Sequence, residues 1–329
     1  MSERTTVLER PQLGVETTSG TAVAADRRIG SLTSFGVTPN LAFDTHLPAG
    51  NKTAAGVMPT REWSDIRAAG VIDYEELTWW LSSMLGGVTP AQQASTAAYK
   101  WTWADTPLTE VVPKSMTFED GSAARAQEIA YGVVTGLDLN FPANASPSLS
   151  FTGIGRALTD GVTITGSLDD PVPHPALRGE VNVYLDDDAA SLGTTKLTRN
   201  FSAKVRFPPR FGPFWTNNTA NGVGFAGLVE VRAIPMVELT VEADSTGMGL
   251  LTPARAGTTK FVRIECAGPN IESTYDYTLL LDFAVQISAL GAQGDSEGIY
   301  AQPYTMTNVY DPTWGQSFGV ELTNELTAI

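Results

Sequence analysis

The side chains that most often carry out chemistry in enzymes are scarce in this sequence. Its 329 residues include two histidines, His46 and His174, and one cysteine, Cys266. His174 lies between prolines in DDPVPHPAL, as expected of a solvated turn, and Cys266 falls at an apolar position of an alternating stretch. No G-x-S-x-G motif frames a serine. We therefore expect no catalytic triad and predict that the protein is not an enzyme.

Metal and cofactor sites are not expected either. Two histidines and one cysteine leave few soft ligands for zinc. The acidic run 186–188 lacks the alternating spacing of a calcium loop, which favours a solvated turn. The glycine-rich stretch 222–227, GVGFAG, does not lie between the strand and the helix of a dinucleotide-binding unit. We assign no catalytic, cofactor-binding or metal-binding residue and expect no cofactor.

The composition argues against several further classes of protein. The chain carries 21 basic and 36 acidic residues, a net charge of −15, which argues against holding nucleic acid by neutralising phosphates. The same charge is compatible with a surface that DNA passes without sticking. A single cysteine allows no disulfide within the chain. No stretch approaches the roughly 18 apolar residues of a membrane span, and the first residues do not resemble a signal peptide. We expect a soluble protein made in a cytoplasm.

One stretch of the sequence predicts a helix. Over residues 73–86, apolar side chains recur at the spacing of one helical stripe: Leu77, Trp80, Leu81, Met84 and Leu85. Asp73 is placed to cap the first turn, and Glu76 occupies the position of a capping-box partner. Two glycines follow and can end the helix. We expect an amphipathic helix that lies across β-sheets and forms part of the core.

Nearly everything else has the period-2 pattern of strands, for example residues 127–141, 237–242 and 277–285. We predict a mainly β protein, a β-sandwich or partial β-barrel with one flanking helix. Residues 21–160 would form a first β module with the helix, and 161–329 a second. Whether the halves are a tandem duplication stays open, because the helix has no obvious counterpart in the second half.

Two segments look like extensions. Residues 1–20 are polar and contain breakers, so we expect an N-terminal arm that becomes ordered on something else. The segment from 21 to about 72 mixes short β-like pieces with prolines and glycines, which is typical of a long functional loop or surface extension. Contacts between subunits would use the arm and the part of this segment near 40–60.

The order of several stretches resembles a known family. These are QLGVETTSGTAV, FGVTPNLAF, the GVIDYEELTWWLSSMLGG helix, YKWTWADT, AYGVVTGLDLNF, VNVYLDDDAASLGTTKLTRNF, YDYTLLLDFAV, DSEGIYAQPY and FGVELTNEL. Together they cover most of residues 11–325, and their order carries more weight than any one of them. The chain resembles the major tail tube proteins of long-tailed, siphovirus-type bacteriophages.

This resemblance implies a structural virion protein. Copies would form rings, of three if each chain holds two fused modules and otherwise of six, and the rings would stack helically into the tail tube. Inner strands would join into a continuous barrel through which DNA passes during ejection without specific binding. The implied partners are copies of the chain, the tape measure protein and tail-end proteins. The implied location is the virion tail, with host cytoplasm during assembly and no membrane.

An acidic lining would let DNA slide, because like charges repel phosphates. The candidates are acidic residues at polar positions of alternating strands, although a solvated outer face explains each of them equally well: Asp138, Glu238, Glu242 and Asp282.

Other functions remain open at this stage. A carbohydrate-binding or adhesin β-sandwich would use Trp101, Trp103 and Trp215 as stacking platforms. Another ring-forming tail protein, such as a tail terminator, would share most of the features above. The run FPPRFGPFW, 207–215, could form an exposed apolar patch for a partner or a sugar, or a buried loop.

Overall fold

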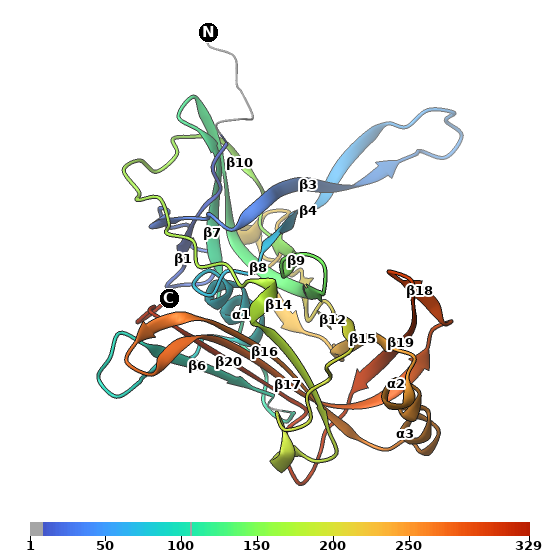
Figure 1. The fold of residues 1–329 in the computed structure, drawn as a ribbon. Helices are drawn as coiled ribbons and strands as arrows, with labels where there is room; N and C mark the ends of the chain where they lie inside the picture. Colours follow the sequence, from blue (N-terminus) through green and yellow to red (C-terminus); the bar gives the residue numbers. More distant parts are fainter. Residues whose placement is uncertain (1–8, 106) are drawn as a thin grey trace.

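The protein is mainly β, as the alternating sequence pattern predicts (Figure 1). The structure, a computed structural model, describes residues 9–105 and 107–329. Its strands pair almost entirely in antiparallel fashion, and several run for more than ten residues. Three short or medium helices accompany them in the described part of the chain.

The elements up to residue 162 are β1 (Gln12–Val15), β2 (Arg27–Arg28), β3 (Leu32–His46), β4 (Gly56–Val71), α1 (Leu77–Leu85), β5 (Ala91–Gln92), β6 (Tyr99–Ala104), β7 (Met116–Ser122), β8 (Arg125–Pro142), β9 (Ser148–Gly155) and β10 (Thr159–Val162). The later elements are β11 (Val181–Asp186), β12 (Asn200–Phe207), β13 (Phe211–Phe214), β14 (Gly227–Glu230), β15 (Met236–Glu242), α2 (Ser245–Gly249), α3 (Leu251–Ala256), β16 (Lys260–Glu272), β17 (Tyr275–Leu290), β18 (Gly294–Ser296), β19 (Ile299–Asn308) and β20 (Phe318–Asn324).

Helix α1 lies in the core, as predicted, but is shorter than residues 73–86. The Asp73 carboxylate accepts hydrogen bonds from the backbone N–H groups of Glu75 and Glu76 in a turn that precedes the helix. Glu76 does not close a capping box. Its carboxylate turns away and accepts hydrogen bonds from the N–H of Gly30 and from Ser31. Hydrogen bonds from two residues far away in the sequence therefore replace a local one.

The predicted stripe of α1 is buried, and so is nearly all the rest of the helix. Leu77, Trp80, Leu81 and Met84 are fully enclosed, whereas Leu85 is only partly buried. The small polar side chains of the opposite face are enclosed as well. The helix is thus surrounded by strands rather than lying across them with one wet face. Trp80 packs on the ring of Phe151 from β9, at 4.6 Å between centroids.

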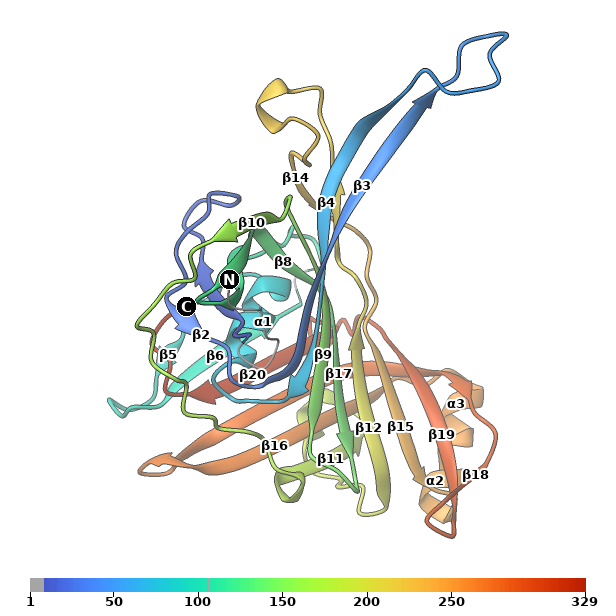
Figure 2. The same cartoon turned by 90° about the horizontal axis from the view of Figure 1, so that it is seen from above.

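Two strands, β8 and β17, are long enough to belong to two sheets each. The C-terminal half of β8 pairs with β9 and β12, and its N-terminal half pairs with β7 and β10. The C-terminal half of β17 pairs with β19, and its N-terminal half pairs with β16 and β20. We call the sheet with the order β3-β4-β9-β8-β12-β15-β19-β17 the long sheet (Figure 2).

The same strand order occurs twice. In the long sheet, β3-β4-β9-β8 is repeated as β12-β15-β19-β17. In the outer sheets, β1-β7-β8-β10 is repeated as β11-β16-β17-β20. The short helices α2 and α3 follow β15 in the place where α1 follows β4. The halves therefore share one topology, which the sequence left open.

The predicted division at residues 20 and 160 needs two corrections. Strand β1 lies between β2 and β7 with Leu13 fully buried, so residues 12–15 belong to the first module and not to an arm. Residues 1–8 of the predicted arm lie outside the described residues. Strand β6 precedes residue 160 but pairs with β20, so it completes the outer sheet of the second module. The modules are joined by strand β6, which comes from the first and pairs in the second, as well as by the β8–β12 pairing.

Candidate functional site: one face, two edges and one projecting hairpin

The face of the long sheet that points away from the core presents polar side chains of both charges. Asp138 on β8 lies opposite Arg206 on β12, and Lys204 lies opposite Glu238 on β15. Lys204 approaches the Asp138 carboxylate at 2.9 Å, and Arg206 approaches it at 3.4 Å. Arg206 also lies 4.0 Å from Glu238. These side chains are partly exposed, so their ion pairs contribute little stability and chiefly balance charge.

Three of the four predicted lining residues lie on this face. Glu242 lies two strand positions beyond Thr240 on β15, on the same side as Glu238, and pairs with Arg199. Each of these acids has a basic partner, so the face carries balanced rather than acidic charge.

Asp282 does not belong to this face. It lies in the N-terminal half of β17, outside the long sheet, where it is buried and accepts two hydrogen bonds of 2.7 Å from Arg263. Burial raises the pKa of the Asp282 carboxyl, against the opposing effect of the Arg263 guanidinium. The alternation in 277–285 correctly places Asp282 on the side of the strand opposite Leu281 and Phe283. It does not show that β17 changes sheets.

The long sheet ends in two open edges. On one side β3 pairs with β4 alone, and on the other the last residues of β17 pair with β19 alone, within the residues that the structure describes. Unpaired strand edges expose N–H and C=O groups that can accept a further strand. The inward-facing side chains near these edges, Phe35, Val37 and Leu290, are only partly covered.

Strands β3 and β4 continue past the sheet as a two-stranded hairpin, which we call the projecting hairpin, residues 41–58 (Figure 2). Strand β9 pairs with β4 only from Ser64 onward, so within residues 9–105 and 107–329 no third strand pairs with β4 before Ser64. A set of large apolar side chains is exposed here: Leu41, Phe43, Leu47, Val57 and Met58. The segment predicted as a long loop near 40–60 is therefore a β-hairpin. Pro48 lies in its turn, and Pro59 lies on β4 before the residues that pair with β9.

The base of the projecting hairpin is held by the loop between β13 and β14. The N–H of Glu62 donates to the carbonyl of Val223 at 2.9 Å. Trp63 and Trp215 meet edge to face at 6.1 Å, and the Arg61 guanidinium lies 5.2 Å from the Trp215 ring. The hairpin is thus fixed where it leaves the sheet, and only its outer part lacks support.

The tryptophans do not form an open stacking platform. Trp101 and Trp103 stack on each other in the core, and their indole N–H groups donate to Asn324 and to the Gly86 carbonyl. Trp215 is partly buried beneath its cation and ring contacts. A sugar-binding surface built from these three residues is therefore not supported.

Most residues of the run 207–215 are only partly buried. Phe207 and Phe211 are buried, and Arg210 pairs with Glu230 at 2.5 Å, while Phe214 stays exposed. Phe207 ends β12 and residues 211–214 form β13, so the run is neither a buried loop nor a continuous exposed apolar patch.

The residues screened for chemistry are dispersed. His46 lies in the projecting hairpin, whereas the His174 ring stacks on Tyr277 at 4.6 Å between centroids. Cys266 is fully buried in β16, and desolvation raises the pKa of its thiol far above the usual range. Asp186 uses its carboxylate to accept backbone hydrogen bonds from Gly193 and Thr195, which order the turn after β11.

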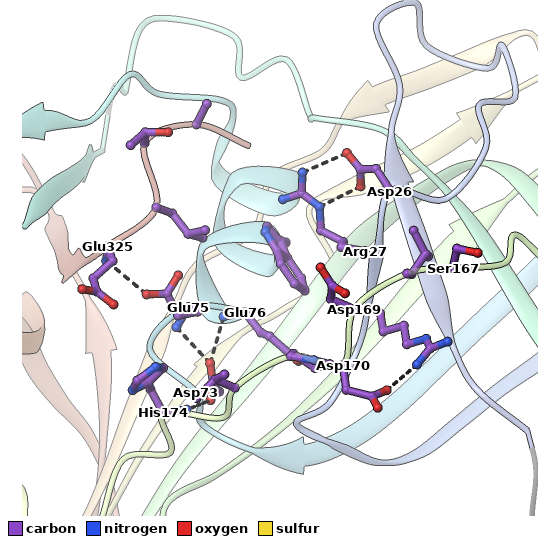
Figure 3. Close-up of a pocket in the computed structure, with 18 residues that line it drawn as sticks. Asp26, Arg27, Asp73, Glu75, Glu76, Ser167, Asp169, Asp170, His174 and Glu325 are labelled. Carbon is purple, nitrogen blue, oxygen red and sulfur yellow. Dashed lines mark hydrogen bonds and ion pairs between the residues drawn. The ribbon is translucent and has the colours of Figure 1, made fainter. Parts of the chain in front are cut away.

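A cavity of about 760 Å³ lies beside the start of α1 (Figure 3). Asp73 accepts hydrogen bonds from the N–H groups of Glu75 and His174, at 2.9 and 2.5 Å, and Glu75 accepts one from Glu325 at 3.1 Å. Burial raises the pKa of the Glu75 carboxyl. These contacts fasten the helix to the segment that connects the modules and to the C-terminal residues. They describe a structural junction rather than a reactive site.

Comparison with known proteins adds no relative. No protein-family model matches the chain. No curated protein matches it either. Within residues 9–105 and 107–329, no helix is long and apolar enough to cross a bilayer. In the same described ranges, no group of three or more His, Cys, Asp or Glu side chains is placed to hold a metal ion. The resemblance to tail tube proteins thus remains a prediction.

Proposed function

We propose that this protein is a structural subunit that assembles with copies of itself into stacked rings, forming a tail tube of a long-tailed bacteriophage. The observation that carries the proposal is the long sheet, which spans both modules and ends in one open edge on each. A sheet with two open edges can be completed by a neighbour on each side, and a closed ring removes every edge.

The projecting hairpin supplies a second kind of contact in this proposal. Its exposed apolar side chains extend beyond the sheet, and a two-stranded hairpin alone is at best marginally stable in water. Contact with the next ring would cover these side chains and order the stack. The edges would then close each ring, and the hairpin would join one ring to another.

The polar face of the long sheet would line the bore. Its acids Asp138, Glu238 and Glu242 are paired with bases, so the face offers phosphates neither a net positive surface nor a strongly repelling one. Such a surface would let DNA pass without specific binding. The paired charges replace the acidic lining expected from the sequence, and they serve the same passage with weaker repulsion.

The further partners follow from the proposal and from the resemblance. A tape measure protein would occupy the bore before DNA does, and tail-end proteins would cap the stack. The assembled form would belong to the virion tail, and the free subunit to the host cytoplasm. No catalytic step and no cofactor enters this function.

Electron microscopy of purified protein across a concentration series tests the proposal. We expect rings or tubes at high concentration and none for Leu290→Lys, which places a charge at the open edge of β17. Leu177→Lys is the matched control, because Leu177 is similarly exposed and lies outside the long sheet. A protein that stays monomeric at every concentration, or a Leu290→Lys variant that assembles normally, would contradict the proposal.

A further inference from the structure

Inside one chain, the two modules meet at a seam of known register. Strand β8 pairs with β12 so that Leu137 lies opposite Phe207 and Leu139 lies opposite Val205. Both members of each pair point into the core and are buried. Leu137 is 1% exposed, and Phe207 is 4% exposed. The seam therefore shows how the last strand of one module joins the first strand of the next.

The repeat places an equivalent of Leu137 at the open edge. In the first module, one row of paired residues runs Leu137, Phe151, Ala68 and Phe35 across β8, β9, β4 and β3. In the second module, the equivalent row runs Leu290, Tyr304, Leu239 and Ala203 across β17, β19, β15 and β12. Leu290 thus takes the place of Leu137, and Phe35 takes the place of Ala203.

Exposure separates the two equivalent leucines. Leu290 is 47% exposed, whereas Leu137 is buried beneath its neighbour β12. On the other edge, Phe35 and Val37 pack only partly against the core, whereas their equivalents Ala203 and Val205 are fully buried. The same inward positions are therefore closed at the internal seam and open at both edges of the long sheet.

We propose that the edge formed by the end of β17 and the residues after it, 290–295, pairs with residues 34–39 of β3 in a second copy in the register of the internal seam, which places Leu290 opposite Pro39 of that copy. Phe207 lies four residues beyond Ala203, and Pro39 lies four residues beyond Phe35. This pairing rests on the proposed ring-forming function and specifies its interface. Proline fits here because Phe207, its equivalent, is the last paired residue of the internal seam.

The register fixes the tilt of the strands. Each module adds four strands to the long sheet and shifts the register by four residues, so a closed barrel has a shear equal to its strand number. Eight-stranded barrels with a shear of eight have the same ratio, and their strands tilt by about 36°. We expect about 36° between the inner strands and the tube axis, whatever the number of copies.

The bore then favours three copies over six. The long sheet contributes eight strands per copy in the described part of the chain. With strands about 4.8 Å apart and tilted by about 36°, three copies give a backbone diameter of roughly 45 Å, and six give roughly twice that. Side chains narrow each bore further, so the smaller one leaves less unused space around a single DNA duplex. Three copies of 35.0 kDa would have a mass of about 105 kDa.

Cysteine cross-linking tests the register directly. The chain with Leu290→Cys and Pro39→Cys is compared with two chains that carry Leu290→Cys with Val37→Cys or with Leu41→Cys. Each control shifts one partner by two residues, about 7 Å along the strand, which exceeds disulfide reach. Native Cys266 is fully buried and does not compete. We expect the predicted pair to form disulfide-linked dimers and trimers at least tenfold faster than either control.

The outcomes separate the register from the function. Equal or faster linking of a shifted pair, or no linking in rings seen by electron microscopy, overturns the register while the ring-forming function stands. Absence of both rings and cross-links in all three chains overturns the two together. Selective linking of Leu290→Cys with Pro39→Cys supports both.

Discussion

The projecting hairpin offers the sharpest test of how rings would stack. Phe43→Ser with Val57→Ser removes apolar surface from two side chains that are 53% and 59% exposed in the single chain. Complete burial of a large apolar side chain is worth roughly 1.5–3 kcal/mol, and about half of that remains to be gained here. The two changes should therefore weaken each docked hairpin by about 2–3 kcal/mol.

This free energy predicts a clear shift in assembly. Because 1.4 kcal/mol corresponds to a factor of ten, the concentration needed for tubes should rise on the order of 50-fold. Pelleting of tubes across a dilution series, with negative-stain images of each sample, measures that concentration. Thermal unfolding of the unassembled chain should barely change, because both side chains already lie half in water.

The matched control removes similar apolar surface elsewhere. Leu108→Ser with Val172→Ser alters two exposed side chains that lie outside the projecting hairpin. We expect this control to assemble at the concentration of the unaltered chain. If Phe43→Ser with Val57→Ser also assembles at that concentration, the hairpin does not join the rings and our reasoning about its exposed surface is refuted.

Three further predictions concern the single chain. Leu81→Asp places an unpaired charge at a fully buried position of α1, at a cost of several kcal/mol, and should prevent folding. A soluble variant with a cooperative urea transition would contradict the burial of the helix. Asp186→Asn should cost roughly 1–3 kcal/mol at pH 7, because the carboxylate accepts hydrogen bonds from Thr194 and its neighbours. Desolvation raises the pKa of Asp186, but these hydrogen bonds outweigh it and lower the pKa in the folded state. The stabilisation is therefore complete above the unfolded pKa of about 4 and is lost as pH falls through the folded pKa. A loss of urea stability in Asp186→Asn that stays constant down to pH 2 would argue against this. Asp282→Asn should cost roughly 2–3 kcal/mol by leaving Arg263 unpaired, and adding Arg263→Met should recover much of it in the same denaturation assay; additive losses would show that the pair is not coupled.

Local sequence signals were sufficient for the helix and for most strands. The helical spacing from Leu77 to Met84 and the alternation in 137–141 each mark a buried side, and the structure confirms both, whereas a bulge between Val134 and Gly136 interrupts the alternation expected from residue 133. These patterns work because burial of one face imposes the period of the element that carries it.

The projecting hairpin and β1 were missed for opposite reasons. The segment contains prolines and glycines that usually interrupt strands, but Pro48 and Gly50 fall in the turn of the hairpin, and Pro59 lies on β4 before the residues that pair with β9. Strand β1 is only four residues long, too short for a period to show, and its order comes from β2 and β7 on either side. In both cases the neighbours of the strand decide its structure.

By itself, the sequence determined that this protein is mainly β, that one helix buries the stripe from Leu77 to Met84 in the core, and that its few histidines and its cysteine suggest no catalytic site. Only the tertiary structure decided that the halves repeat one topology, that Asp138 and Glu238 face basic partners, and that Asp282 lies away from them. The physical reason is that a residue pattern encodes which side of a strand is buried. It does not encode which strand lies next to it, because pairing depends on contacts between residues far apart in the chain.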